Sequence, residues 1–510
     1  MAFVLGLLAV FAMPPIYQIY LLIPAFSGLL WMAVDAPTRW KAFVVGWWFG
    51  AGFFTGGLYW VSFALLVDAE KFAWLMPIAI FGFAFGLGLF VALNTLVVRM
   101  IPGDLTAKAM VLAGTWVLLE WIRSWIFTGL PWNPLGSVWA FADAPLQVTW
   151  LVGVFGLSLF TALLAVMPGT FGQASQNNNP QDNGPIRLLI ASVAAMGVVW
   201  VGGSYRLADA TDAVVDGVRL RLIQPNIPQN EKWKPELRQR NIMAQVDLAL
   251  SPPKVGEPTP THIIWAETSA PFFIENSPEW RRLIGAATPK GGLTILGAPR
   301  VLPDASDDGS FKVANALLAL DDKGRVTDTY DKFHLVPFGE YVPLSDWLPL
   351  DKITQGQGAF TPGPGLQTLN LKGLPPVSPL ICYEVIFPGA VVNPDDNLDR
   401  RAQWLLNLTN DAWYGATAGP HQHFVSARLR AVEEGLPAVR VAFTGISGIV
   451  DAYGRTQSIR ALGEKGFVDG GLPIAVKAIG PYSQYGDVIP VLMALLTLLL
   501  ASLHVIRNRT

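Results

Sequence analysis

Cysteine and charged residues are both scarce in this sequence of 510 residues. The one cysteine, Cys382, excludes an intrachain disulfide in any compartment. Charged residues make up 15% of the chain and the net charge is −2, which excludes the strongly basic balance typical of nucleic-acid-binding proteins. Hydrophobic residues make up 52%, which is high for a soluble protein. The composition therefore points to a membrane.

Long stretches without charge recur in the first 205 residues. Residues 42–67 and 72–98 contain no charged side chain, and each is long enough to cross a bilayer as a helix. Weaker apolar stretches complete the expected set of spans: 2–12, 16–34, 109–128, 148–167, 188–205 and 488–505. We therefore predict about eight transmembrane helices. Seven belong to a membrane domain at 1–205, and the eighth, with a cytoplasmic tail, lies at 488–510, after a polar insert at 206–487.

Basic residues in the short loops predict the orientation, because they are enriched on the cytoplasmic side. With the amino terminus in the cytoplasm, that side collects seven of them: Arg39, Lys41, Arg99, Lys108, Arg187, Arg507 and Arg509. The short loops of the opposite side collect only Lys71. This bias predicts that the insert lies outside the cytoplasm.

Two charged residues, Glu120 and Arg123, fall inside a predicted span. Their spacing allows them to pair on one face of a helix. Charges inside a membrane are commonly functional, and a structural pair near the outer end of the span is the other interpretation. The sequence GLPWN at 129–133 cannot continue as a regular helix, so we expect it at the outer interface or along a cavity.

The insert alternates between strand and helix patterns. Expected strands, the fourth of them a hairpin turning near Gly324, are 218–223, 261–266, 292–299, 313–330, 377–383, 404–408 and 438–451. Helical patterns cover 226–250 and 421–435. Strands mixed with helices predict a layered α/β domain with its own core.

Three reactive side chains, Glu267, Lys332 and Cys382, come at the ends of predicted strands or just after the hairpin. In α/β folds such ends gather reactive groups at one edge of a sheet. A thiol needs a base to become a nucleophilic thiolate, a buried carboxylate can serve as that base, and a lysine can stabilise an oxyanion. Considered singly, the cysteine is more typical of a buried hydrophobic residue, and each of the two charged residues is more typical of a surface charge or an ion pair.

Three blocks carry a resemblance to a known family. They are WAE at 265–267, DKFHLVPFGE at 331–340 and ICYE at 381–384. They resemble the catalytic blocks of the carbon-nitrogen hydrolase (nitrilase) superfamily, which uses a Glu-Lys-Cys triad on a four-layer αββα sandwich. Many members have proline where this chain has Ala266. The resemblance implies an extracytoplasmic nitrilase-like domain at 206–487 with Glu267, Lys332 and Cys382 as its triad.

The resemblance becomes narrower when the whole chain is considered. Eight spans around such a domain, together with QPNIPQ at 224–229, KW at 232–233, HLVPFGE at 334–340 and NDAWYG at 410–415, resemble the apolipoprotein N-acyltransferase family of bacterial inner membranes. We therefore expect a multi-pass inner-membrane protein with its catalytic domain in the periplasm.

The family resemblance implies a two-step, ping-pong acyl transfer. Cys382, with Glu267 as base and Lys332 as oxyanion stabiliser, takes the sn-1 acyl chain of a phospholipid, with phosphatidylethanolamine as the expected donor. The resulting thioester passes the chain to the α-amino group of a diacylglyceryl-cysteine at the amino terminus of an apolipoprotein. Supporting or substrate-shaping roles are carried over to five further residues: Glu340, Tyr383, Glu384, Trp233 and Trp413. No cofactor and no metal ion are expected.

A thioester must be shielded from water, or the enzyme becomes a lipase. An apolar run after the second block could form a lid, or it could be an ordinary hydrophobic loop. Its residues are Phe338, Val342, Leu344, Trp347 and Leu348.

Other functions fit the sequence less well. A membrane-tethered nitrilase-type amidase that uses water as acceptor remains the main alternative, since the triad alone does not exclude it. A transporter would leave the large insert unexplained. The chain contains no G-x-S-x-G nucleophile elbow. His421 and His423 are two positions apart on a predicted helix and so face different sides, which argues against a shared metal.

Overall fold

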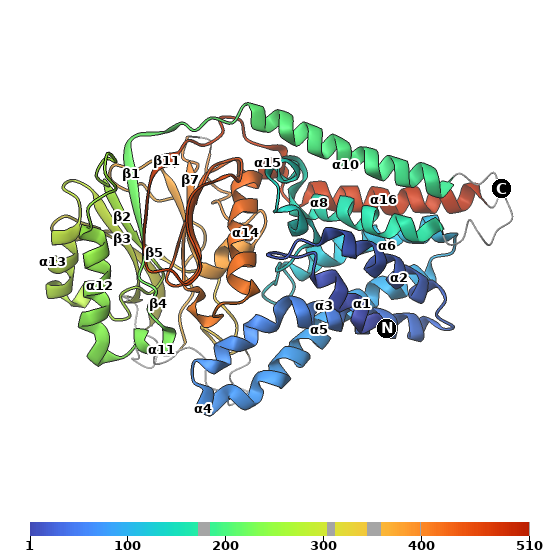
Figure 1. Cartoon of the computed structure of the whole chain (residues 1–510), viewed down its shortest axis with the longest axis horizontal. Helices are drawn as coiled ribbons and strands as arrows, with labels where there is room; N and C mark the ends of the chain where they lie inside the picture. Colours follow the sequence, from blue (N-terminus) through green and yellow to red (C-terminus); the bar gives the residue numbers. More distant parts are fainter. Residues whose placement is uncertain (172–183, 303–311, 344–358, 398, 509–510) are drawn as a thin grey trace.

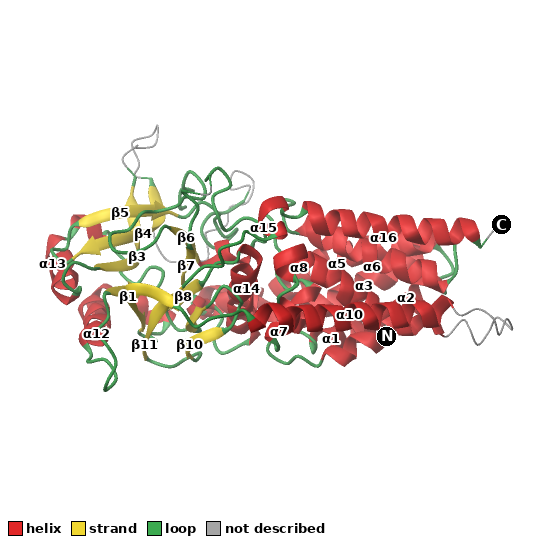
Figure 2. Cartoon of the chain, turned by 90° about the horizontal axis from the view of Figure 1, so that it is seen from above, coloured by secondary structure: helices red, strands yellow, loops and turns green. Residues whose placement is uncertain are grey.

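The computed structural model describes all residues except 172–183, 303–311, 344–358, 398 and 509–510. The chain forms a helical region at one end and a region of two β-sheets at the other (Figure 1). The chain begins and ends in the helical region, because both its first and its last helix belong to that region (Figure 2).

The helical region contains six helices that are long and apolar enough to cross a membrane, among the described residues: Arg39–Leu66, Ala69–Met100, Leu105–Arg123, Thr149–Thr170, Leu189–Ala208 and Val488–Arg507. The first two expected spans are shorter helices, α1 (Ala2–Val10) and α2 (Leu22–Val34). The helices named below are α3 (Arg39–Leu58), α5 (Met76–Met100), α6 (Leu105–Arg123), α8 (Thr149–Val166), α10 (Gly184–Ala208) and α16 (Val488–Arg507). The membrane part of the predicted fold is thereby confirmed.

Helices α3 and α5 pack closely because glycine lies at their contact. A Cβ atom added at Gly50 of α3 would lie 2.7 Å from the Cα atom of Gly88 in α5. A Cβ atom at Gly46, one turn earlier, would lie 2.4 Å from the carbonyl oxygen of Val91. Small residues spaced by four positions are a common way for membrane helices to approach each other.

This contact predicts a position-specific loss of stability. Gly50→Leu should lower the unfolding free energy by about 1–3 kcal/mol, because the larger side chain forces α3 and α5 apart. The matched control is Gly86→Leu, since a Cβ at Gly86 on α5 meets nothing within 4 Å. The measurement is thermal or denaturant unfolding of the protein in detergent, and equal stability of the two variants would contradict the close packing.

The sheet region is built from one six-stranded and one five-stranded sheet. The first has the order β11-β1-β2-β3-β4-β5 and the second β10-β9-β8-β7-β6. The strands of the first are β1 (Val214–Gln224), β2 (His262–Trp265), β3 (Leu293–Val301), β4 (Val313–Asp321), β5 (Val326–Asp331) and β11 (Gly466–Pro473). Those of the second are β6 (Val377–Ile381), β7 (Trp404–Thr409), β8 (Ala438–Ala442), β9 (Ser447–Val450) and β10 (Thr456–Arg460). β1, β2 and β3 run parallel, as do β6, β7 and β8.

The two sheets enclose one apolar layer between them. Alternate residues of the strands meet there, such as Leu222 and Ile264 from one sheet and Leu406 and Val441 from the other. Helices α12 (Arg238–Leu250) and α13 (Pro278–Ala287) cover the outer face of the six-stranded sheet. Helix α14 (Ala418–Glu434) covers the five-stranded sheet and lies between it and the helical region (Figure 1). The layers are therefore αββα, which confirms the predicted fold class.

Two expected elements of the insert differ in the structure. The predicted helix at 226–250 begins only at Arg238, because Pro228 and Pro235 start two short turns before it. The predicted strand at 438–451 is two antiparallel strands, β8 and β9.

Helix α14 joins the two regions through buried polar contacts. The Oε1 atom of Glu433 accepts a hydrogen bond from the backbone N–H of Val154 in α8 at 2.8 Å. Gln422 accepts from the indole N–H groups of Trp60 and Trp132, at 3.1 and 2.8 Å. These bonds fix the sheet region against the helices, so a site at this junction faces both.

Candidate active site

The three side chains predicted to react lie at neighbouring strand ends. Glu267 follows β2, Lys332 follows β5 and Cys382 follows β6. All three are buried, with at most 8% of each residue exposed. Because β2 and β5 belong to one sheet and β6 to the other, the site lies where the two sheets face each other.

Lys332 lies between two carboxylates. Its Nζ atom is 2.8 Å from Oε2 of Glu340 and 3.9 Å from Oε1 of Glu267. Asn315, on β4, donates from Nδ2 to the same two carboxylates, at 2.8 Å to Glu267 and 2.9 Å to Glu340. Burial opposes the charge of Lys332, but the two carboxylates outweigh it and raise the pKa of the lysine. Lys332 is therefore held as an ammonium group.

Glu267 is restrained by a close backbone contact as well as by its hydrogen bond. A Cβ atom added at Gly297, on the neighbouring strand β3, would lie 2.7 Å from the Cα atom of Glu267. Burial raises the pKa of the Glu267 carboxyl group, and the charge of Lys332 opposes this rise. A raised pKa brings the carboxylate closer to the range in which it can accept a proton from a thiol.

Cys382 has an unusual backbone conformation, with φ at +53°. It begins a short 3-10 helix, Cys382–Ile386. A positive φ in a residue other than glycine is strained and persists only where the surroundings hold it. Here the carbonyl oxygen of Cys382 accepts from Nδ2 of Asn407 at 3.2 Å and lies 3.1 Å from Nε2 of His423. Strand β7 and helix α14 therefore both hold the turn that presents the sulfur.

A buried ion pair holds these two partners in turn. Nδ1 of His423 lies 2.9 Å from Oδ1 of Asp411, and Arg440 donates to Oδ2 of Asp411 at 2.7 Å. Arg440 also donates to the side-chain oxygen of Asn407 at 2.5 Å. Despite its burial, the pKa of Asp411 falls to about 2 because of Arg440 and His423. The carboxylate therefore stays charged and keeps the cluster fixed.

The Cys382 thiol is neutral when the site is at rest. Burial, together with the negative charge of Glu267, raises the pKa of the thiol to about 12, although Lys332 acts in the opposite direction. A neutral thiol is a weak nucleophile, so a reaction at this sulfur requires proton removal during the attack.

Glu384 ties the turn of Cys382 to the segment that carries Lys332. Its carboxylate accepts from the backbone N–H groups of Ile381 at 2.7 Å, Phe333 at 2.8 Å and His334 at 3.1 Å. The hydroxyl of Tyr330 donates to it at 3.0 Å. Burial raises its pKa to about 7, against the effect of these donors and of Lys332. Glu384 thus connects two parts of the site.

Tyr383 points toward the helical region. Its hydroxyl donates to the carbonyl oxygen of Gly129 at 2.7 Å. Its ring packs edge-on against His334 and Phe387, with centroids 5.5 and 5.0 Å away. The residue after Cys382 is therefore held by the loop that follows α6.

Trp233 and Trp413 lie near a buried lysine that the sequence reasoning did not assign to the site. Lys232 donates from Nζ to the carbonyl oxygen of Glu267 at 3.0 Å and lies 4.1 Å from the centroid of the Phe443 ring. Burial lowers its pKa to about 7, although Glu267 and Cys382 oppose this. With the Asn410 amide oriented to match donors with acceptors, its oxygen accepts from Lys232 at 3.2 Å and from the Trp413 indole at 3.3 Å.

Sequence reasoning also missed Asn315, Asn407 and His423 as parts of the site. Each lies within a strand or helix, so neither spacing nor a strand end marks it. His423 was considered only as half of a metal pair with His421, and the structure places its ring between Asp411 and the Cys382 carbonyl instead. Among the described residues, no group of three His, Cys, Asp or Glu side chains is placed to hold a metal ion.

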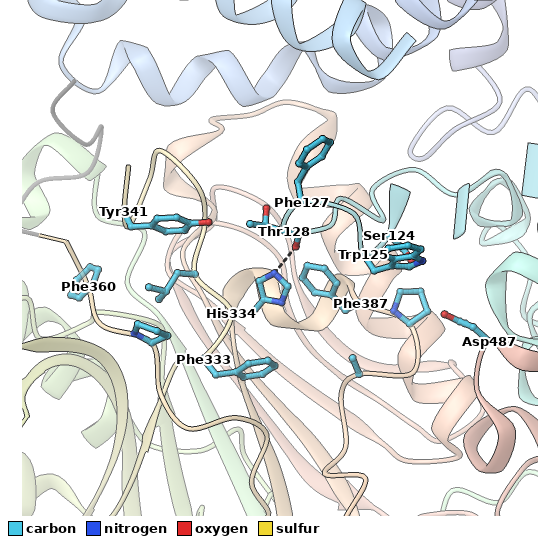
Figure 3. Close-up of a pocket in the computed structure, with 14 residues that line it drawn as sticks. Ser124, Trp125, Phe127, Thr128, Phe333, His334, Tyr341, Phe360, Phe387 and Asp487 are labelled. Atoms are coloured by element: carbon cyan, nitrogen blue, oxygen red, sulfur yellow. Dashed lines mark hydrogen bonds between the residues drawn. The ribbon is translucent and has the colours of Figure 1, made fainter. Parts of the chain in front are cut away.

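A cavity of about 700 Å³ lies between the two regions, beside the site (Figure 3). Its lining is mostly apolar and comprises Ser124, Trp125, Phe127, Thr128, Phe333, His334, Leu335, Tyr341, Phe360, Pro362, Phe387, Pro388, Ala390 and Asp487. His334 stacks on Phe387 at 4.0 Å, and its Nε2 atom lies 2.8 Å from the carbonyl oxygen of Thr128. The lining thus includes Phe333 and His334, which follow Lys332, and Phe387 at the end of the 3-10 helix of Cys382, but not the three reacting side chains themselves.

Part of the predicted lid lies outside the described residues, namely Leu344, Trp347 and Leu348. Of the other two, Phe338 has φ at +62° and a side chain that is 44% exposed, and Val342 is half-buried. The lid remains a prediction.

The layers and the membrane helices define a class of protein, a membrane protein that carries a carbon-nitrogen hydrolase fold. Residues 258–466 match the family model for carbon-nitrogen hydrolase, and residues 5–167 match the model for the apolipoprotein N-acyltransferase N-terminal domain. Apolipoprotein N-acyltransferase of Rhodopseudomonas palustris is 34% identical over 99% of this chain and 94% of the relative, and that of Brucella melitensis is 36% identical over 99% and 95%. The chain belongs to the apolipoprotein N-acyltransferase family. Among solved structures, an amidase from Nesterenkonia sp. matches with 21% identity and a TM-score of 0.35, over 52% of this chain and 94% of the amidase.

The negative charge of Glu267 should affect the pKa of the Cys382 thiol. Glu267→Gln should lower the apparent pKa of Cys382, because it removes a negative charge while Lys332 keeps its positive one. Since Cys382 is the only cysteine, the rate of alkylation by iodoacetamide across pH reports this ionisation directly. Glu257→Gln is the control, because Glu257 lies before the start of β2, whereas Glu267 follows its end, and pairs with Arg219 of β1. An unchanged pKa in Glu267→Gln would mean that the carboxylate does not act on the sulfur.

Proposed function

We propose that this protein transfers an acyl chain from the sn-1 position of a phospholipid to the α-amino group of the diacylglyceryl-cysteine of apolipoproteins. The chain is carried as a thioester on Cys382. The observation that carries the proposal is the position of Cys382, in a strained turn beside Glu267 and Lys332, where the sheet region meets the membrane helices. The names of the relatives agree with this activity.

In the first step, Glu267 accepts the proton of Cys382 as the sulfur attacks the ester carbonyl carbon. The carbonyl oxygen gains negative charge, which the ammonium of Lys332 stabilises. When the ester C–O bond breaks, Glu267 returns the proton to the leaving oxygen. A lysophospholipid departs, and the acyl chain stays on the sulfur as a thioester.

In the second step, the α-amino group of the apolipoprotein attacks the thioester carbonyl carbon. Glu267 accepts a proton from the attacking amine, and Lys332 again stabilises the oxyanion. The C–S bond breaks, the sulfur takes up the proton, and the triacylated lipoprotein leaves. The high pKa of the resting thiol fits this cycle, because the proton is exchanged with Glu267 and not lost to solvent.

The other residues around the reacting groups support them without exchanging protons with the substrate. Glu340 and Asn315 hold Lys332 and Glu267 at their distances. Glu384 keeps the turn of Cys382 beside the segment of Lys332. Trp233 and Trp413 lie beside Lys232 and shape that part of the site. The proposed reaction needs no cofactor.

The phospholipid, with phosphatidylethanolamine as the expected donor, reaches the site from the bilayer. The mostly apolar cavity between the regions, lined in part by the residues that follow Lys332, is suited to hold part of a lipid. We place the protein in the bacterial inner membrane with the residues at 206–487 in the periplasm.

The ends of several helices support this orientation. The Nε atom of Arg99, near the end of α5, donates to Ala36 at 3.0 Å, and His504 in the last turn of α16 lies 2.9 Å from Asp104 before α6. The carboxyl end of α16 lies at the end of the molecule that is distant from the sheets (Figure 2). Basic residues expected in the cytoplasm therefore lie opposite the site.

The thioester gives the direct test. Purified protein incubated with phosphatidylethanolamine that carries a labelled sn-1 chain should gain label that neutral hydroxylamine removes. Cys382→Ala should gain none, because the nucleophile is absent. Cys382→Ser is the matched control, since any label on an oxygen would resist neutral hydroxylamine. Equal labelling of Cys382→Ala and the unmodified protein would contradict the proposal.

Lys332 should affect the rate of thioester formation. Lys332→Met should lower the single-turnover rate by about 10²–10³-fold, the usual effect of removing an oxyanion donor. Lipid binding, measured by equilibrium partitioning, should change little. Lys323→Met, in the exposed turn between β4 and β5, is the control. A rate within twofold of the unmodified protein would exclude Lys332 from the reaction.

A further inference from the structure

Two charged side chains in a membrane-spanning helix have no part in the chemistry above. Glu120 and Arg123 lie in the last turn of α6 and are 6% and 3% exposed. Burying a charged group in a membrane-spanning helix is energetically unfavourable, so the groups that each charge binds indicate its role.

Both side chains direct hydrogen bonds to the segment that follows α6, residues 128–135, which we call the strap. Arg123 donates from one terminal nitrogen to the carbonyl oxygens of Leu130 at 2.5 Å and Trp132 at 2.9 Å. The Oε1 atom of Glu120 accepts from the backbone N–H of Leu135 at 2.8 Å. The guanidinium group also lies 5.3 Å from the centroid of the Phe54 ring. The two charges thus bond to the backbone at the middle and the end of the strap.

The strap needs such partners because it is not helical. Backbone carbonyls without helical hydrogen bonds are unfavourable at membrane depth unless the protein supplies donors. Its backbone is also irregular, with φ at +77° for Gly129, which glycine adopts without strain, and at +53° for Asn133. A Cβ atom at Gly129 would lie 2.2 Å from the carbonyl oxygen of Ser124, so only glycine fits there.

The other side of the strap contacts the residues next to both Cys382 and Lys332. The carbonyl of Gly129 accepts from the hydroxyl of Tyr383 at 2.7 Å. The carbonyl of Thr128 lies 2.8 Å from Nε2 of His334, a bond between two residues that line the cavity (Figure 3). The ring of Trp132 lies 5.2 Å from the ring of His423, which itself contacts the Cys382 carbonyl.

We propose that Glu120 and Arg123 are positioning residues for acyl transfer. They fix the strap, and the strap holds the turn of Cys382 and the segment of Lys332 at their working separation. Thr128 at the beginning of the strap and three residues before it, Ser124, Trp125 and Phe127, also line the cavity. The strap therefore fixes the position of this wall of the cavity relative to Cys382 and Lys332. The inference rests on the proposed function of the cavity and of Cys382.

The experiment is a double-mutant cycle on the single-turnover rate of thioester formation from labelled phosphatidylethanolamine. Arg123→Lys keeps the charge but replaces the rigid guanidinium group, whose one terminal nitrogen donates to both carbonyls, with a shorter, flexible ammonium group. Tyr383→Phe keeps the ring and loses only the bond to Gly129. Each should slow thioester formation about 10- to 100-fold, because a small displacement of reacting atoms has an effect of this order. The double variant should be no slower than the slower single variant, since both changes break the same connection.

Arg99→Lys is the matched control, because Arg99 also binds a backbone carbonyl from a membrane helix, at the opposite end. Its rate should equal that of the unmodified protein. Effects of Arg123→Lys and Tyr383→Phe that multiply, or an unaltered rate in Arg123→Lys, would overturn the inference.

Further comparisons distinguish a loss of folding, a failure of the proposed function and a failure of the role proposed for the strap. If Arg123→Lys does not fold, Tyr383→Phe still tests the connection, and an unaltered rate in that variant would overturn the inference. If the unmodified protein forms no thioester, the proposed function fails. A thioester in the unmodified protein with unaltered rates in both variants would refute only the role of the strap.

Discussion

The interaction on which the site depends is the buried ammonium of Lys332 between two carboxylates. Glu340 compensates the charge of the lysine at 2.8 Å, and Glu267, at 3.9 Å, is less closely paired with it. Asn315 holds both carboxylates and fixes their separation. In the proposed reaction, Glu340 can therefore remain the counter-ion while Glu267 acts as the base. The cluster is expensive to bury unless each member is paired, so the surrounding β-strands must hold it precisely.

The second requirement is the conformation of Cys382. Its positive φ turns the thiol away from the path of β6, and the structure retains this strained conformation through bonds from three directions. Asn407 and His423 bind its carbonyl, Glu384 binds the backbone just before it, and the strap binds the side chain just after it. The last of these bonds comes from the membrane region. The turn of Cys382 is therefore held jointly by the αββα sandwich and by the strap of the helical region, which suits the proposed lipid substrate.

Much of this arrangement could be predicted from local patterns. Apolar stretches of bilayer length predicted the membrane helices, and short apolar stretches before Glu267 and Cys382 predicted two strand ends of the sandwich. The resemblance supplied the pairing of those residues with Lys332. What could not be predicted depends on contacts distant in sequence. Asn315 is an ordinary strand residue until β4 is placed beside Glu267. Arg440 acts on Cys382 only indirectly, through Asp411 with His423 and through Asn407. The partners of Arg123 were close in sequence, but a strap with positive φ angles leaves no periodic pattern to read.

The central claim is that the thioester is protected for transfer to an amine. The most direct measurement starts from protein already labelled on Cys382 and freed of phospholipid, which is then mixed either with buffer or with a diacylglyceryl-cysteine peptide that has a free amino terminus. The account predicts that the label persists in buffer, and that it moves to the peptide amine within the time of a catalytic turnover once the peptide is added. Release of the label as free fatty acid at the same rate with and without peptide would contradict the account and identify the protein as a hydrolase.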